Sequence, residues 1–264
     1  MRTALAIARK ELTIYFTTPW AYAVFTAMLA LASFFFVGML HEFQRTQELA
    51  RTYGWEKIPA QFRNLTDGVM VPFWSSVMII TLFVAPFLSM RLFAEEKRNK
   101  TFELLMTTPV RPLEIVLGKY LGGLGIITAT LGLTILYPVL LTLFGQSESG
   151  TVLEWTTVWL GYGGLLLWGA TCMAIGLFIS TLTESQMVAA LLTFAILLPW
   201  TMLRGLAQTF EEPVRSFIEH LSFDAQLQGL LRGVVELEAL VFFCSVIFFC
   251  LLLSHRAVEA QRWA

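Results

Sequence analysis

The stretch Trp155–Thr183, WTTVWLGYGGLLLWGATCMAIGLFISTLT, contains no aspartate, glutamate, lysine, arginine or histidine. An α-helix needs about 20 consecutive, mostly apolar residues to cross the hydrocarbon core of a bilayer. The stretch is long enough, and its apolar residues form one continuous block instead of alternating with charged residues at a helix or strand period. We therefore expect it to be a membrane-spanning helix.

The rest of the chain repeats this pattern. Whereas an ordinary soluble domain is about 45–50% apolar and about 25% charged, this chain is 56% apolar and 14% charged. The other five blocks without charged residues or histidine are Trp20–Leu40, Val69–Met90, Tyr120–Gln146, Ser185–Leu203 and Ala239–Ser254. Residues 1-264 are thus expected to form a single domain, an all-α integral membrane protein with six transmembrane helices.

The distribution of charge between the blocks predicts the orientation of the chain. If the first segment lies in the cytoplasm, the segments on that side hold 11 of the 18 basic residues but only 7 of the 19 acidic residues. Because loops rich in lysine and arginine stay in the cytoplasm, this bias places both termini there. The first outer loop, which carries Arg45, Arg51, Lys57 and Arg63, runs against the trend.

Residues 1-18 predict an amphipathic helix lying flat on the inner leaflet, which we term the elbow helix. Its apolar residues recur at helical spacing, at Ala4, Leu5, Ala8, Leu12, Tyr15 and Phe16. Its charged residues include Arg9, Lys10 and Glu11, and the two basic ones lie off the apolar stripe. Thr18-Pro19 then supplies a helix N-cap and a first-turn proline, so the first span should begin there.

The segment 94-111 joins the second and third spans and should form a short cytoplasmic helix. Its apolar face comprises Phe102, Leu105 and Met106. Pro109 should end this helix, because the residue before a proline is pushed out of the α region. Pro112 stands where a first-turn proline would start the third span. A helix held between two such turns could transmit a push from a partner to both neighbouring spans.

The segment 204-238, between the fifth and sixth spans, predicts two amphipathic helices dipping into the outer leaflet as re-entrant elements. The first apolar stripe comprises Phe210, Val214, Phe217, Ile218 and Leu221. The second comprises Leu227, Leu230, Leu231 and Val234. Gly118 and the glycines of the third and fourth blocks should allow close helix packing, either within one chain or at a dimer face or substrate path.

The stretch from Glu95 to Lys119 resembles the cytoplasmic coupling loop of the ABC-2 permease family. The matching residues are Glu95-Glu96-Lys97-Arg98, Thr101, Glu103, Leu105, Pro109-Val110 and Gly118-Lys119. The sequence departs at Lys100, where the family usually has glycine. The opening Ala8–Leu12 with Thr18-Pro19 also resembles the elbow helix of that family, and more specifically its gliding-motility and copper-enzyme-maturation type members.

The resemblance implies a permease subunit of an ATP-driven exporter in the bacterial inner membrane. Two such subunits, copies or paralogues, would pair in the lipid, with spans two and five lining the path. Each would contact a separate ABC ATPase that binds ATP and magnesium, and a periplasmic accessory protein stays open as a further partner. The residues that map onto the ATPase contact are Glu95, Glu96, Thr101, Glu103, Leu104, Leu105, Pro109 and Val110.

No cofactor, metal or catalytic residue is expected in the chain itself. It contains no Gly-x-x-x-x-Gly-Lys-Ser/Thr phosphate loop, so nucleotide should bind to another polypeptide. All three cysteines lie inside apolar blocks, where a thiol packs as a small hydrophobic group. The few basic residues are explained by topology and do not indicate nucleic-acid binding.

Two alternatives differ in class from this interpretation. A gradient-driven transporter usually places ionisable residues in the membrane, and the six blocks hold none, although broken-helix carbonyl groups could substitute. An intramembrane enzyme would use Glu95-Glu96, followed by Lys100, as in prenyl-type membrane proteases, with paired histidines that bind zinc. The histidines here, in unrelated segments, are His41, His220 and His255. Nothing in the sequence selects a substrate among lipids, polysaccharides, peptides and small molecules.

Overall fold

The computed structural model describes residues 2–54, 56, 58–102, 110–145 and 153–261. Within these ranges every regular element is helical. Six helical segments are long and apolar enough to cross a membrane. The prediction of an all-α protein with six spans is therefore confirmed.

The charge-free stretch that begins at Trp155 forms the central helix of the bundle, α8 (Trp155–Leu182). It packs against four of the other spanning helices and against a short helix, α11 (Phe223–Leu231). Those spanning helices are α3 (Val71–Ser89), α6 (Pro112–Thr134), α9 (Gln186–Ala207) and α12 (Leu237–Gln261). A helix surrounded by others needs no charged face, which explains its composition.

The first span is much longer than its apolar block. Helix α2 (Pro19–Tyr53) has 35 residues and a length of about 52 Å, against about 30 Å for a hydrocarbon core. It ends at Gly54, which has a φ of 85°. The charge-free block ends at Leu40, but the helix continues beyond it, because charged residues end a hydrophobic block without breaking a helix.

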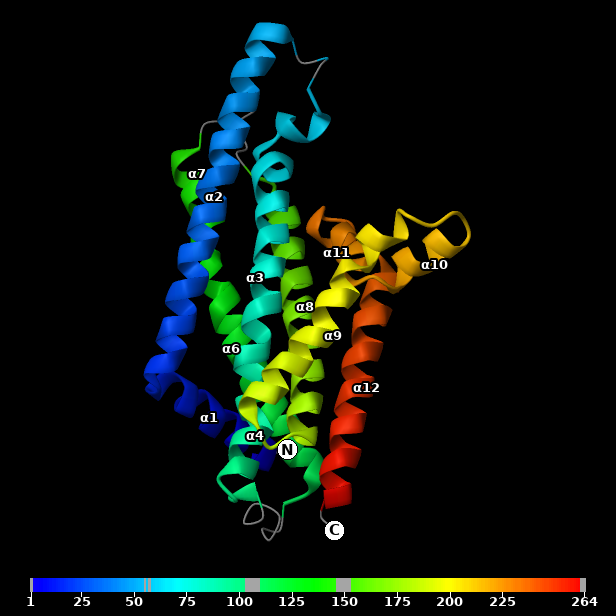
Figure 1. Cartoon of the computed structure of the whole chain (residues 1–264). Helices are drawn as coiled ribbons and strands as arrows, with labels where there is room; N and C mark the ends of the chain where they lie inside the picture. Colours follow the sequence, from blue (N-terminus) through cyan, green and yellow to red (C-terminus); the bar gives the residue numbers. More distant parts are fainter. Residues whose placement is uncertain (1, 55, 57, 103–109, 146–152, 262–264) are drawn as a thin grey trace.

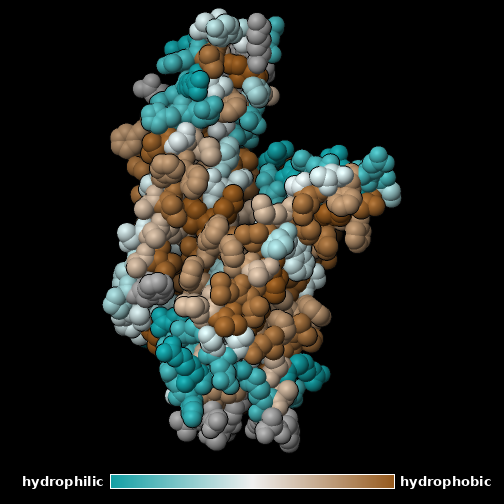
Figure 2. Space-filling model, in the orientation of Figure 1, coloured by the Kyte–Doolittle hydropathy of each residue, from teal (hydrophilic) through white to brown (hydrophobic). Residues whose placement is uncertain are grey.

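Short helical turns pack beside the far part of α2. These are η2 (Ala60–Arg63) and η3 (Thr66–Met70), which leads into α3. The Gln47 side-chain amide of α2 donates a hydrogen bond of 3.1 Å to the carbonyl of Phe62. Helix α7 (Leu136–Phe144) continues α6 after a break at Ile135 and lies beside α2, where the Tyr137 hydroxyl donates to the carbonyl of Leu29 at 3.0 Å (Figure 1). The far part of α2, with η2 and η3, forms an extension beyond the apolar belt of the molecule (Figures 1 and 2).

The opposite end of the bundle holds α1 (Arg2–Thr17), α4 (Arg91–Arg98) and the last turn of α12 (Figure 1). Helix α1 is the predicted elbow helix, and it meets α2 at Thr18-Pro19 as expected. The Thr18 hydroxyl, however, does not cap α2. It donates to the carbonyl of Ile14 at 2.6 Å, which leaves Pro19 alone to start the helix.

The two helices predicted before the last span are present as α10 (Val214–Leu221) and α11. They form an arm at the side of the bundle, hydrophilic on its upper surface and apolar beneath (Figures 1 and 2). Helix α10 is shorter than the first predicted stripe, since Phe210 precedes it, and α11 begins and ends earlier than the second, since Val234 follows it. An ion pair of 2.9 Å between Arg204 and Asp224 fixes the arm to α9. Insertion of this arm into the outer leaflet stays a prediction.

Glycines on α6 form the surface on which the elbow helix lies. A Cβ atom added at Gly118 would stand 2.8 Å from the carbonyl oxygen of Ala4. One added at Gly122 would stand 2.7 Å from the Cβ of Glu11, and one at Gly125 would stand 2.9 Å from Leu12. Close packing within one chain, one of the two predicted uses of these glycines, is what the structure shows.

Replacing Gly118 with alanine should therefore destabilise the protein. The new methyl group would meet backbone, which cannot rotate away, so we expect a loss of about 1–3 kcal/mol in unfolding free energy. Gly132→Ala is the matched control, because nothing lies within 4 Å of its Cβ position. There alanine should be neutral or stabilise by about 0.5–1 kcal/mol. Thermal unfolding of the detergent-purified chain measures both, and equal shifts would contradict the packing.

Candidate functional site

Helix α4 continues α3 after Met90 and is held on the bundle by a serine of α8. The backbone N–H groups of Phe93 and Ala94 both donate to Ser180 Oγ at 3.0 Å. The same hydroxyl donates to the carbonyl of Met90 at 3.2 Å. The first turn of any helix leaves N–H groups without intrahelical partners, and here a distant helix supplies the acceptor. Movement of α4 is therefore tied to α8.

Three helices meet at a buried ion cluster, which consists of Glu11, Glu96 and Lys119. Lys119 Nζ, on α6, donates to Glu11 Oε1 of α1 at 2.9 Å and to Glu96 Oε1 of α4 at 2.8 Å. The Lys119 side chain is only 2% exposed, and its ammonium group stands 5.2 Å from the ring centroid of Phe93. A buried charge is tolerated only when it is paired and hydrogen-bonded, so the placement of each of the three helices depends on the other two here.

The charges of the buried ion cluster do not balance within it. Two carboxylates face one ammonium group, and Glu96 Oε2 is buried without a hydrogen-bond partner among the described residues. Lys10 Nζ lies 3.9 Å from Glu96 Oε1, with its side chain 61% exposed. Lys10 lies on the exposed surface of the elbow helix, and its positive charge offsets the excess negative charge of the buried ion cluster.

The elbow helix is also anchored by Tyr15. Its hydroxyl donates to the carbonyl of Leu88 at the end of α3. The guanidinium group of Arg91 lies 5.8 Å from the Tyr15 ring centroid. Burial, assisted by the nearby Glu11 carboxylate, raises the pKa of Tyr15 well above its usual value. The hydroxyl therefore stays a hydrogen-bond donor at every physiological pH.

Helix α4 ends in a tight turn with an unusual residue. The N–H of Thr101 donates to the carbonyl of Glu96 at 3.0 Å, and that of Lys100 donates to Lys97 at 3.1 Å. This pair of bonds defines a Schellman motif, in which the residue at the position of Lys100 adopts a left-handed conformation. Lys100 has a φ of 56°. Glycine normally takes this position because it has no Cβ.

The family model described as ABC-2 family transporter protein matches residues 5–253. The chain belongs to the ABC-2 transporter family. The match runs from the elbow helix to the later turns of α12, so it includes every residue of the buried ion cluster. A search of curated proteins found no match.

The predicted ATPase-contact residues of this ABC-2 protein are only partly within the described ranges. Glu95 pairs with Arg91, through contacts of 2.9 and 3.3 Å. Glu96 points inward to Lys119, Thr101 is exposed and Val110 is half-buried. The remaining residues, which lie outside the described ranges, are Glu103, Leu104, Leu105 and Pro109. The role of the whole set in binding a partner stays a prediction.

Sequence reasoning missed the buried ion cluster. The third charge-free block begins at Tyr120, but the span itself begins at Pro112, as expected, so Lys119 lies inside α6 just before the block. The six blocks hold no ionisable residue, whereas the third spanning helix does hold Lys119. Two apolar residues of the elbow helix, Leu5 and Phe16, are 63% and 41% exposed, as expected for side chains that would meet lipid on a helix lying against a leaflet. The residues of α1 that are buried are Ala4, Ala8, Glu11 and Tyr15.

That buried set carries the signal that could have identified Glu11. The residues recur at intervals of three and four, so Glu11 shares a helical face with two alanines. A carboxylate on an otherwise apolar face needs a basic partner. Lys119 is a candidate, because it directly follows Gly118, and a glycine lets another helix approach closely. In the described ranges no group of three or more histidine, cysteine or acidic residues is placed to hold a metal. Glu95 and Glu96, the two acidic residues of the membrane-protease alternative, form ion pairs with Arg91 and Lys119.

Replacing Lys119 with methionine should strongly destabilise the ABC-2 chain. Two carboxylates would remain buried without their counter-ion, at a cost of about 3–5 kcal/mol. The triple variant Glu11→Gln, Glu96→Gln, Lys119→Met should recover most of the loss, because no buried charge is left unpaired. Lys10→Met is the control and should change stability by no more than about 1 kcal/mol.

Thermal unfolding in detergent measures all of these variants. A Lys119→Met protein as stable as the parent would show that the lysine is not buried with the two glutamates. A triple variant no more stable than the single one would show that packing, rather than charge pairing, sets the cost.

Proposed function

We propose that this chain is the permease subunit of an ATP-driven exporter and that a separate ABC ATPase drives it. The family match over residues 5–253 carries this proposal. The absence of a phosphate-loop motif from the full sequence supports the assignment of nucleotide hydrolysis to another chain. The finer placement among gliding-motility and copper-enzyme-maturation type members rests only on the motif at the elbow helix.

The packing around α4 suggests how a partner would act on the spans. The segment 94-111 begins in α4, which is tied to α8 through Ser180 and to α1 and α6 through Glu96. A force applied to this segment would reach three helices at points that are buried and hydrogen-bonded. Because closely packed interiors resist deformation and transmit strain, a displacement of α4 would be passed on to the helices that these contacts join. This is the behaviour that a coupling loop requires.

We further propose that the chain lies in a bacterial inner membrane with both termini in the cytoplasm. The excess of basic residues in the segments on that side supports this orientation. The end of α12 and the elbow helix lie at one end of the bundle, as an even number of spans requires (Figure 1). The functional unit would be a dimer of this chain with a copy or a paralogue.

Charge reversal in the coupling segment tests the function. Glu103→Lys should lower the ATPase activity that co-purifies with the chain by about tenfold, since a charged contact truncated in an interface costs about 1.4 kcal/mol or more. Membrane insertion should be unchanged. Glu259→Lys, on α12 at the same end of the bundle, is the control and should leave the activity intact.

Affinity purification of the full chain from native membranes identifies the partner. Recovery of a polypeptide with a phosphate-loop motif supports the proposal. Recovery of no nucleotide-binding chain, or unchanged ATPase activity in a variant that carries both Glu103→Lys and Leu105→Glu, would refute it.

Cysteine labelling tests the orientation. In a variant without native cysteines, Glu48→Cys on the far part of α2 should react with a membrane-impermeant maleimide in intact spheroplasts. Arg256→Cys, on α12, should react only after lysis. Both positions are exposed in the structure, so a lack of reaction reports the side of the membrane. The reverse pattern would contradict the proposed topology.

A further inference from the structure

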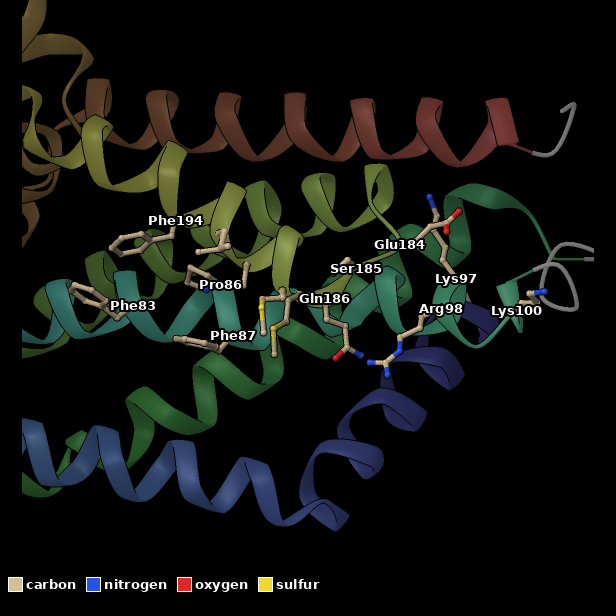
Figure 3. Close-up of a pocket in the computed structure, with 14 residues that line it drawn as sticks. Phe83, Pro86, Phe87, Lys97, Arg98, Lys100, Glu184, Ser185, Gln186 and Phe194 are labelled. Atoms are coloured by element: carbon tan, nitrogen blue, oxygen red, sulfur yellow. The ribbon is translucent and has the colours of Figure 1, made fainter.

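The third span consists of two helices, α6 and α7, which meet at Ile135. Pro138 lies in the first turn of α7, where a proline fits because the N–H groups there need no intrahelical acceptor. A proline does not by itself divide a span of this protein. Helix α3 continues past Pro86 (Figure 3), and α9 continues past Pro199. The division of the third span therefore depends on the contacts of its two parts as well as on the proline.

The hydroxyl group of Tyr162, on α8, replaces the hydrogen bond that Pro138 cannot make. Proline has no N–H, so the carbonyl of Thr134, four residues earlier, has no intrahelical donor from that position. Tyr162 Oη donates to this carbonyl at 2.7 Å, and both residues are buried. An unsatisfied carbonyl in hydrocarbon would be costly. The end of α6 is thus held against α8, and a bend at this point has one helical hydrogen bond fewer to break.

Helix α7 is attached to the first span. The Tyr137 hydroxyl, which donates to the carbonyl of Leu29, also lies 2.8 Å from the Ser33 hydroxyl of α2. The Tyr137 ring packs against Phe36 of α2, with ring centroids 4.9 Å apart. The ring of Phe73, on α3, lies 5.0 Å from the Tyr137 ring, but this contact is apolar and sets no fixed direction. The polar contacts of Tyr137 therefore join α7 to α2.

The two parts of the third span differ in how firmly the bundle holds them. The elbow helix, α8 and α12 all pack on α6. In α7, by contrast, Leu143 and Phe144 are 71% and 79% exposed. Helix α2 itself meets the bundle along one narrow face, whose buried apolar residues between positions 19 and 40 are Ala21, Phe25, Met28, Ala32 and Phe36. The pair formed by α2 and α7 is thus less firmly packed than the pair formed by α6 and α8.

We propose that the break at Ile135 is a hinge, at which α7 turns together with α2 while α6 stays against α8. Hinges commonly lie at the ends of helices, where a few residues absorb the change of angle. Helix α2 has such a bend at its base, at Thr18-Pro19. The first span can then tilt while the lower part of the third span keeps its place. The inference goes beyond the proposed function, because it concerns the chain alone and requires neither the ATPase nor a transported substrate.

Distances between spin labels test the hinge. In the full chain without native cysteines, nitroxides are attached in pairs to three exposed positions, Leu143→Cys on α7, Glu48→Cys on α2 and Thr156→Cys on α8. Pulsed electron paramagnetic resonance in lipid nanodiscs measures the distance distribution of each pair. A turn of about 20° at a proline kink moves the end of a helix as long as α7 by about 5 Å. Both distributions that include position 156 should therefore be about 5 Å broader than the distribution between positions 143 and 48.

Two variants should change these widths in different ways. Tyr137→Phe keeps the ring but removes the hydroxyl, so the distribution between α7 and α2 should broaden to match the other two. Pro138→Ala supplies an N–H for the carbonyl of Thr134 and should join α6 and α7 into one rigid helix. The distribution between α7 and α8 should then narrow by about 5 Å. Pro199→Ala, the matched control, replaces a proline inside α9 and should leave all three widths unchanged.

Thermal unfolding tests the part played by Tyr162. Tyr162→Phe should lower the unfolding temperature of the parent chain, because the carbonyl of Thr134 loses its donor. In the Pro138→Ala background the same change should have little effect, since the alanine N–H bonds to that carbonyl. Equal losses in the two backgrounds would show that Tyr162 does not replace the missing helical hydrogen bond.

Three results from the spin labels would overturn the proposal. These are equal widths for all three pairs, a narrower distribution between α7 and α8 than between α7 and α2, and widths that neither Tyr137→Phe nor Pro138→Ala alters. The widths measured in the parent chain decide the proposal even where a variant fails to fold.

Discussion

The exclusion of water from the hydrocarbon core is the constraint on which this structure depends. Every backbone polar group at that depth needs a partner within the protein, and helices supply it without help from neighbouring segments. Helix α8 meets this constraint most completely, since it has protein on nearly all sides and its glycines let Trp74 and Ile127 approach closely. The other spans are arranged around it, with their lipid-facing sides covered by large apolar residues such as Phe34, Phe248 and Leu191.

At the end of the bundle that carries α1 and α4, ion pairs as well as apolar contacts hold the helices together. The buried ion cluster joins three separate segments of the chain, the elbow helix, α4 and α6. Such a junction contributes little net stability, because desolvation offsets most of the attraction. Its value lies in specificity, since only one relative placement of the three helices satisfies the charges.

The sequence was informative where a single physical rule decides the outcome. Blocks without charge identify six spans, and the prolines at positions 19 and 112 mark two helix starts correctly. It was less informative where two rules compete. The charged residues after Leu40 end the apolar block, yet they also favour helix, so the length of α2 depends on contacts with η2 and η3. Glu11 and Lys119 look like surface residues individually, and their burial follows only from the close approach of two helices. The partner contacts of residues 94-111 depend on a second protein and cannot be derived from this chain.

The unbroken length of α2 has a mechanical consequence. It is joined to the elbow helix at Thr18-Pro19, and its other end stands beyond the apolar belt, about 52 Å away. A stiff rod hinged at its base converts a slight rotation there into a sideways displacement of its tip that grows in proportion to its length. Rocking of α1 at one surface of the membrane would thus be magnified beyond the opposite surface, where no lipid opposes movement of the tip.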